Sequence, residues 1–129
     1  MNQMMKTLCL FGATVCAVAA PPMPTVIDTE AVPWDVGPED GITLKRFNGN
    51  LARLNIVRWE NGTLAAPHTH ATEQIILVQS GRYRITLEDQ EYVMEAGDLM
   101  VFPSYVLHGI EALEDSAHIA VFSPAALPE

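Results

Sequence analysis

Between two glycines the chain reads Gly62-Thr-Leu-Ala-Ala-Pro-His-Thr-His-Ala-Thr-Glu-Gln-Ile-Ile-Leu-Val-Gln-Ser-Gly81, and this segment sets the architecture expected for the whole molecule. His68 and His70 are two positions apart, and alternate residues of an extended strand project from the same face. Gln74 has the same parity, whereas Glu73 points to the opposite face unless a β-bulge intervenes. The spacing therefore predicts two imidazoles and one amide that converge on a metal ion.

A second segment supplies a fourth donor, and it reads Gly97-Asp-Leu-Met-Val-Phe-Pro-Ser-Tyr-Val-Leu-His108. Its first two residues favour a turn, the apolar run that follows is typical of a short strand, and Pro103 ends that strand. His108 comes after a short bend, near the start of another apolar run. We therefore expect His108 to complete the cluster.

Together the two segments resemble the two conserved motifs of the cupin family, in which glycines bound the metal-binding residues at these spacings. The resemblance extends over residues 25–124. It implies an all-β protein, a single small antiparallel β-barrel of the cupin (double-stranded β-helix, jelly-roll) type. It also implies one divalent metal ion inside the barrel, with the ligands His68, His70, Gln74 and His108.

The chain departs from the usual cupin motifs at three positions. Gln74 occupies the position of the acidic ligand, Tyr105 stands where a glycine is usual, and Ala112 stands where an asparagine is usual. With no anionic ligand, a bound ion keeps its full positive charge and acts as a strong Lewis acid. Mn²⁺, Fe²⁺, Ni²⁺ and Zn²⁺ are all compatible with this donor set. The alternative is a metal-free barrel whose histidines have no ligand role.

The length and charge of the chain narrow its class. A chain of 129 residues is long enough for one domain with a single core. Its formal net charge is −9, from 16 acidic and 7 basic residues, and the acidic residues are dispersed. This charge disfavours partners such as nucleic acid or an anionic membrane surface. We expect a small-molecule substrate instead.

Residues 1–20 differ in composition from the rest of the chain. Lys6 is followed by a mostly apolar run, and Ala17-Val-Ala19 offers a small-x-small cleavage site before a proline-rich linker. This order predicts a signal peptide over 1–20, a cupin domain over 21–129, and a periplasmic or secreted protein that has no membrane contact after processing. The alternative is an uncleaved strand in a cytosolic protein. Cys9 and Cys16 both lie in this segment, so the mature chain has no thiol.

Short β-rich runs separated by turn residues fill the rest of the chain. The predicted strands are 42–47, 51–60, 73–79, 82–88, 92–95, 99–102, 107–113 and 117–122, with a further short strand at 25–28. Residues 31–40 are predicted to form an irregular loop because they contain two prolines and a glycine. The absence of a helical period favours an all-β barrel or sandwich without reference to any family.

The end of the chain narrows the resemblance within the cupins. It resembles the small cupins similar to the uronate ketonases of pectin and alginate catabolism, whose last strand carries an Asp and an Arg that act on substrate. Phe122, Ser123 and Pro124 match that pattern, whereas Ala120 and Ala126 occupy the Asp and Arg positions. The resemblance implies that Phe122 faces the barrel interior and contacts substrate.

Other candidate site residues follow from parity and position. His118 shares a strand face with Ala120 and Phe122, so we expect it to act as the displaced acid/base residue. The alternative is a structural histidine at the barrel rim. Tyr105, in the second motif, is the other candidate catalytic residue. Arg84 lies on the basic face of its predicted strand, where it either meets a substrate carboxylate or is solvated.

Three functions fit these features. The first is a metal-dependent lyase or isomerase acting on a small oxygenated metabolite such as a sugar acid. The second is an oxygen-dependent dioxygenase, and the third is a non-catalytic metal or ligand binder, which the two alanines favour. The family resemblance and the apolar strand residues of the N-terminal third also predict a homodimer.

Overall fold

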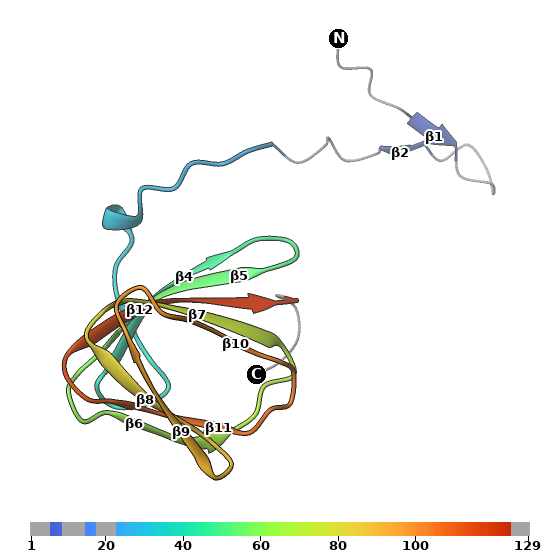
Figure 1. Ribbon diagram of the computed structural model, residues 1–129. Coiled ribbons are helices and arrows are strands. Elements are labelled where there is room, and N and C mark those ends of the chain that lie inside the picture. The colour runs from blue at the N-terminus through green and yellow to red at the C-terminus, as the bar shows by residue number, and fades with distance from the viewer. Residues whose placement is uncertain (1–5, 9–14, 18–22, 125–129) are drawn as a thin grey trace.

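The computed structural model describes residues 6–8, 15–17 and 23–124. They form two antiparallel sheets that face each other, together with a separate two-stranded pair near the N-terminus (Figure 1). The strands are β1 (Lys6–Leu8), β2 (Val15–Ala17), β3 (Asp35–Val36), β4 (Ile42–Asn48), β5 (Arg53–Trp59), β6 (Leu64–His68), β7 (Glu73–Ser80), β8 (Arg82–Leu87), β9 (Gln90–Glu95), β10 (Leu99–Phe102), β11 (His108–Ala112) and β12 (Ser116–Ser123).

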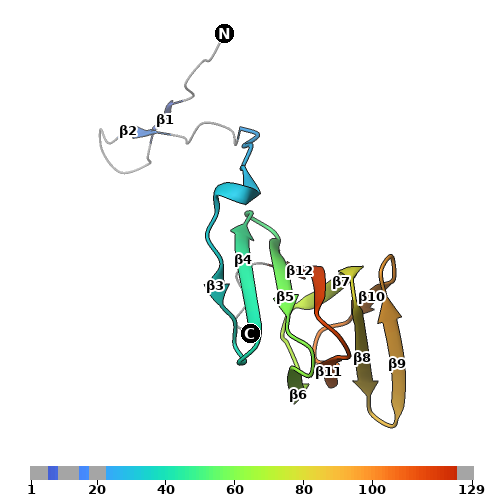
Figure 2. The same ribbon diagram turned by 90° about the vertical axis from the view of Figure 1, so that its left-hand side faces the viewer.

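The larger sheet has six strands in the order β10-β7-β12-β5-β4-β3, and the smaller has four in the order β6-β11-β8-β9. Figure 2 shows the larger sheet running from β3 through β4 and β5 to β12, with β6 and β11 opposite it. The all-β, jelly-roll prediction is confirmed. The strands predicted from 42–47 to 117–122 are all found, with bounds shifted by at most two residues.

Three local predictions need correction. Residues 25–28 are not a strand; they lead into a short 3₁₀ helix, Thr29–Ala31, whose first turn is capped by the Asp28 carboxylate. The short strand β3 lies inside the predicted loop 31–40 and pairs with β4. The segment from Gly62 to Gly81, which forms the first cupin motif, is not one continuous strand, because β6 belongs to the smaller sheet and β7 to the larger one. The chain therefore crosses between the sheets inside the motif.

Gly81 shows why the first motif ends in glycine. It has a φ of +77° in the turn between β7 and β8, a conformation that other residues rarely adopt. A Cβ atom there would also lie 2.6 Å from the carbonyl oxygen of Asp115. Both constraints require a glycine at the point where the chain returns from the larger sheet to the smaller one.

The core lies between the two sheets. It is built from residues of alternating parity on each strand, because successive side chains of a strand point to opposite faces. The most deeply buried apolar side chains come from both sheets, and they are Ile76, Val78, Tyr83, Ile85, Phe102, Ala112 and Ala120. Burial of this set supplies the main hydrophobic stabilisation of the fold.

The outer face of the larger sheet is also apolar. Eight aliphatic residues form two rows across four strands, and we call them the outer aliphatic face: Leu54, Val121, Ile75 and Val101 in one row, and Ile56, Ile119, Leu77 and Leu99 in the other. Leu99 and Val101 are about half exposed, and Leu54 and Leu77 are 36% and 37% exposed. A contiguous apolar patch of this kind is typical of an interaction surface.

The N-terminal arm covers another part of the outer surface. The Nζ atom of Lys45 donates a hydrogen bond to the carbonyl of Thr29 at 2.7 Å. The Trp34 ring lies under the guanidinium of Arg58, with Cζ 3.9 Å from the ring centroid. Within the described residues, no helix is long and apolar enough to cross a bilayer. Most of the predicted signal peptide lies outside the described residues, apart from the paired strands β1 and β2.

Candidate metal centre

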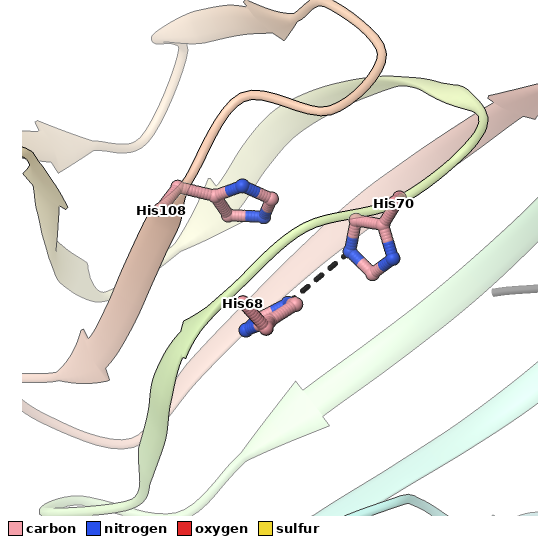
Figure 3. Close-up of side chains that lie close together, drawn as sticks. All are labelled: His68, His70 and His108. Atoms are coloured by element: carbon pink, nitrogen blue, oxygen red, sulfur yellow. Dashed lines mark hydrogen bonds between the residues drawn. The ribbon is translucent and has the colours of Figure 1, made fainter.

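Three histidines meet where β6 and β11 lie side by side. His68 is the last residue of β6, and it pairs directly with His108, the first residue of β11. His70 lies in the link between β6 and β7, so its position depends on this link and not on strand parity. The three imidazole rings point toward one another (Figure 3), and one ring nitrogen from each lies within 4.8 Å of the others. The structure thus brings the three predicted histidines together.

Two of the imidazoles are oriented by their own chain. Nδ1 of His68 donates to the carbonyl of Ala66 at 2.7 Å, and Nδ1 of His108 donates to the carbonyl of Val106 at 2.9 Å. Because Nδ1 carries the proton in this arrangement, Nε2 of each ring is left with a lone pair for a metal ion. The separation of the Nε2 atoms of His68 and His70 is 3.2 Å. Two nitrogens that share one ion at about 2.1 Å must lie roughly 3 Å apart, so this pair fits.

Gln74, the fourth predicted ligand, lies on the inner face of β7. It is paired with Phe102 on one side and Phe122 on the other. The Phe102 ring lies 4.5 Å from the His108 ring, and the Phe122 ring lies 5.7 Å from the His70 ring, measured between centroids. Gln74 is therefore flanked by the two phenyl rings that pack against the histidines.

Two buried polar atoms in this region could each bind a metal ion through a lone pair. Neither has a hydrogen-bond partner within the described residues. They are Oε1 of Gln74 and Nε2 of His108, which belong to side chains only 6% and 1% exposed. A buried polar atom without a partner destabilises a fold by roughly 1–3 kcal/mol, so such atoms are rare unless a ligand satisfies them. The donor set therefore fits a divalent ion.

The electrostatics of the cluster favour neutral imidazoles. Burial, together with the smaller effects of His68, His108 and Arg53, lowers the pKa of His70 to about 4. Burial also lowers the pKa of His108. Both rings are therefore uncharged at neutral pH, which is the state that binds a metal. No carboxylate within the described residues joins the three histidines, so a bound ion keeps its charge.

A cavity of about 730 Å³ opens beside the histidines, and both sheets contribute to its wall. His68, His70 and Gln74 line it. So do Phe122 and Ala120, the inward-facing residues of β12. Phe122 therefore faces the interior, as the family resemblance implies. Its position next to the donor cluster suits contact with a ligand.

His118 lies deep in the same cavity and not at the rim. Its side chain is 3% exposed, and its Nδ1 is 2.8 Å from the hydroxyl of Tyr83, to which it is hydrogen-bonded. The Trp59 ring packs nearby, with its centroid 6.3 Å from that of His118. Burial lowers the pKa of His118 to about 4, so the ring is neutral at pH 7. Burial also raises the pKa of Tyr83.

Two other candidate residues lie outside this cavity. Arg84 alternates with the buried Tyr83 and Ile85, so its side chain projects from the opposite face of β8, where it forms an ion pair with Glu111 at 2.7 Å. The Tyr105 side chain is 71% exposed. Neither lines the cavity wall. The role suggested for each of them therefore has no support from the geometry.

Tyr105 has a structural position instead. Its φ is +65°, in the left-handed region, which explains why a glycine is usual there. Its main-chain N–H donates to the carbonyl of His70 at 2.7 Å. The loop before β11 therefore helps to place the link that carries His70.

Two residues of the cavity wall were not predicted from the sequence. Arg46 and Asn55 lie opposite each other on β4 and β5, and both line the cavity. Their parity with the apolar residues Leu44 and Val57 was the available signal, since those neighbours face the core. Neither residue belongs to a cupin motif, so motif reading passes over them.

Comparison with known proteins gives consistent matches. The cupin domain profile (Cupin_2) matches residues 55–123. The pectin degradation protein KdgF of Dickeya dadantii (strain 3937) is 30% identical over 102 residues, which cover 76% of this chain and 90% of that protein. The structure of KdgF from Halomonas sp. superposes with a TM-score of 0.73 at 30% identity, over 79% of this chain and 94% of that one.

A third match concerns the fold alone. An RmlC-like cupin from Shewanella frigidimarina NCIMB 400 superposes with a TM-score of 0.72 at 22% identity, over 81% of this chain and 94% of that one. The chain thus spans nearly the full length of each of these three proteins.

Proposed function

The chain belongs to the cupin family and is related to the pectin degradation protein KdgF, and from this we propose that it is a metal-dependent enzyme acting on a small sugar acid. The observation that carries the proposal is the pair of buried donors without partners, Gln74 Oε1 and His108 Nε2, beside a large cavity. An enzyme site of lyase or isomerase type needs an electrophile at one end of a cavity and a proton acceptor within reach.

We assign the metal ligands to His68, His70, Gln74 and His108. When bound, a divalent ion supplies Lewis-acid stabilisation of negative charge on a substrate oxygen. The Nδ1 hydrogen bonds of His68 and His108 hold those rings with Nε2 toward the cluster. The neutral donor set leaves the choice among Mn²⁺, Fe²⁺, Ni²⁺ and Zn²⁺ to availability and coordination number.

We assign the proton acceptor to His118. The pKa of His118 is about 4, which is close to that of an ordinary carboxylate. His118 therefore has the basicity of the aspartate that the related cupins are expected to carry at the position of Ala120. Its contact with the Tyr83 hydroxyl through Nδ1 leaves Nε2 as the nitrogen that exchanges a proton with substrate. Phe122 provides an apolar wall against which one face of a sugar ring packs.

The test begins with elemental analysis of the purified protein, followed by assay of the metal-loaded form on unsaturated uronates and related enols. We expect turnover without oxygen consumption. A His118→Gln variant should keep its metal and lose roughly 10²-fold or more in rate. Unchanged turnover in that variant would remove His118 from the mechanism, and oxygen uptake coupled to turnover would favour a dioxygenase.

One observation favours a second candidate function, a non-catalytic ligand binder. Ala120 is 2% exposed, and it places a methyl group where the related enzymes are expected to carry an acid. In that case the metal-loaded protein binds uronates without converting them. Calorimetric binding together with unchanged product chromatograms would establish this outcome.

We also propose export and assembly. Removal of residues 1–20 would deliver the cupin domain to the periplasm or the medium, which mass spectrometry of the mature protein tests. The outer aliphatic face would pair with a second copy of the chain, because eight aliphatic residues in two rows form a surface suited to a symmetric interface.

A further inference from the structure

The cavity wall carries a polar group on the strands next to β12. Asn55 of β5 pairs with Ala120 of β12 on one side and with Arg46 of β4 on the other. β4, β5 and β12 are consecutive in the larger sheet (Figure 1). Arg46, Asn55 and Ala120 all line the cavity, so they form one inward-facing row. The alanine that replaces the expected acid therefore has Asn55 directly beside it and Arg46 one strand further on.

Asn55 is an amide with unused hydrogen-bonding capacity. Its side chain is 5% exposed, and Oδ1 is buried with no hydrogen-bond partner in the part of the chain that the structure describes. Buried amides of this kind are normally paired, because desolvation without a partner is unfavourable. A hydroxyl group of a ligand in the cavity would donate to Oδ1 and satisfy Asn55.

Arg46 brings a positive charge to the same row. Its side chain is exposed at the cavity wall, and it forms no ion pair with a carboxylate of the described residues. Glu39, an acidic residue that also lines the cavity, precedes β4. Arg46 lies near the other end of that strand, roughly 13 Å from Ile42 at the strand rise. The Arg46 charge is therefore not neutralised by Glu39.

A second guanidinium, that of Arg53, lies near the same row. Arg53 lies one inward-facing position from Asn55 on β5, and its Cζ lies 4.6 Å from the centroid of the Phe122 ring. Arg46 acts electrostatically on Arg53, and Arg53 acts on His70. Arg46 thus places a positive charge at the cavity wall in a chain of net charge −9. Such a charge attracts anions into a cavity.

The position of this row suits a ligand that also reaches the histidines. Asn55 and Gln74 are separated by β12 and by one inward-facing row, a distance of roughly 12 Å between their Cα atoms at ordinary strand spacing and rise. Two side chains and one sugar ring fill such a gap. A ligand bound at Arg46 can therefore extend along the wall to the donor cluster.

We propose that Arg46 and Asn55 form the subsite that binds the carboxylate end of a sugar-acid substrate, the guanidinium pairing with the carboxylate and the amide oxygen accepting from the adjacent hydroxyl group. The subsite would do from β4 and β5 what the absent Arg is expected to do from the end of the chain in the related cupins. A guanidinium matches a carboxylate through two parallel hydrogen bonds, which gives specificity as well as affinity. The assignment rests on the proposed function, whose substrate class it defines.

The test uses equilibrium calorimetry on the full, metal-loaded chain. The probes are galacturonate, which is saturated, the uncharged hexose galactose, and inorganic phosphate. The wild type should bind galacturonate roughly tenfold or more tightly than galactose, and Arg46→Gln should abolish that preference. Asn55→Ala should weaken galacturonate binding by roughly 3- to 10-fold. Metal content and melting temperature are measured for every variant.

Arg58→Gln is the matched control. It removes the same charge from β5, but Arg58 projects from the outer face against Trp34, and its loss should leave galacturonate affinity unchanged. The subsite is overturned if Arg46→Gln keeps the preference, if the wild type shows none, or if phosphate binds as tightly as galacturonate. These outcomes are separate from turnover. In the wild type, turnover without the preference for galacturonate removes only the subsite, and the preference without turnover removes only the catalytic proposal.

Discussion

The two faces of the larger sheet are built from alternate residues of the same strands, yet they differ in kind. In β5, Arg53 and Asn55 face the cavity side while Leu54 and Ile56 face outward. An antiparallel sheet with one solvated face normally places apolar residues inside and polar ones outside. Near the cavity this chain reverses that order. The reversal supports the ligand proposed for the inner face and the second copy proposed for the outer one, since neither arrangement favours an isolated, empty barrel.

The largest expected effect comes from the donor cluster, whose His68 and His108 lie on the smaller sheet, opposite the inner face of the larger one. Replacing both His68 and His108 by Ala should reduce bound metal from about one ion per chain to a trace, because two of the four donors are lost. The melting temperature of the metal-loaded protein should fall toward that of the metal-free protein, since an ion at 1,000 times its Kd stabilises the fold by about 4 kcal/mol.

Elemental analysis and scanning calorimetry check this expectation, with His118→Gln as the control that keeps its metal. Stoichiometric metal in the double variant would contradict the assigned ligands.

The second-largest effect is expected from a charge placed in the outer aliphatic face. Leu77 lies between Ile119 and Leu99 in one row of the outer aliphatic face. A Leu77→Lys variant would place a charge at the centre of the proposed dimer interface and should raise the dimer dissociation constant roughly 30-fold or more. Light scattering at micromolar concentration should give the monomer mass, with metal content unchanged. A monomeric wild-type protein would refute the interface.

A third prediction returns to the inner face and concerns acid stability. The folded-state pKa of His118 is about 4, below the ordinary value of 6.5, so the unfolded chain binds the proton more readily. The stabilising contribution is therefore complete above pH 6.5 and is lost as the pH falls to 4. The loss amounts to about 3 kcal/mol in the free energy of unfolding.

Urea unfolding between pH 4 and 7, with chelator present throughout, measures this dependence. Subtraction of the profile of His118→Gln isolates the His118 contribution. Parallel profiles for the two proteins would mean that His118 is not buried in its neutral form.

The smallest effect concerns Arg84, on the outside of the barrel. Its ion pair with Glu111 joins two side chains that are 39% and 36% exposed. Arg84→Gln should lower the free energy of unfolding by less than about 1 kcal/mol and leave metal content and turnover unchanged. A large loss of activity in this variant would show that substrate reaches the outer surface of the smaller sheet.

The sequence predicted the fold and part of the site for identifiable reasons. The all-β fold and the family follow from short alternating runs and from two motifs with fixed spacing. Phe122 and His118 reach the cavity because strand parity is a local property, and β12 is regular over both residues.

Parity failed where the chain is not a regular strand. The link at His70 carries the chain between sheets, which no local pattern reveals. Arg84 shows a related difficulty, since an arginine on an alternating strand suits either a ligand or solvent until the inner face is known. Arg46 and Asn55 were not predicted as site residues, because a polar residue at a core-facing position contradicts the binary pattern that identifies the core.

The contact between Tyr105 and His70 has a consequence for how the chain tolerates change. The rings of His68 and His108 are each fixed by a nearby carbonyl of their own strand region, whereas the link carrying His70 is tied to the second motif through the main-chain N–H of Tyr105. A main-chain contact does not depend on the side chain that accompanies it. Position 105 can therefore carry a tyrosine in place of the usual glycine while the contact that anchors the third donor is kept.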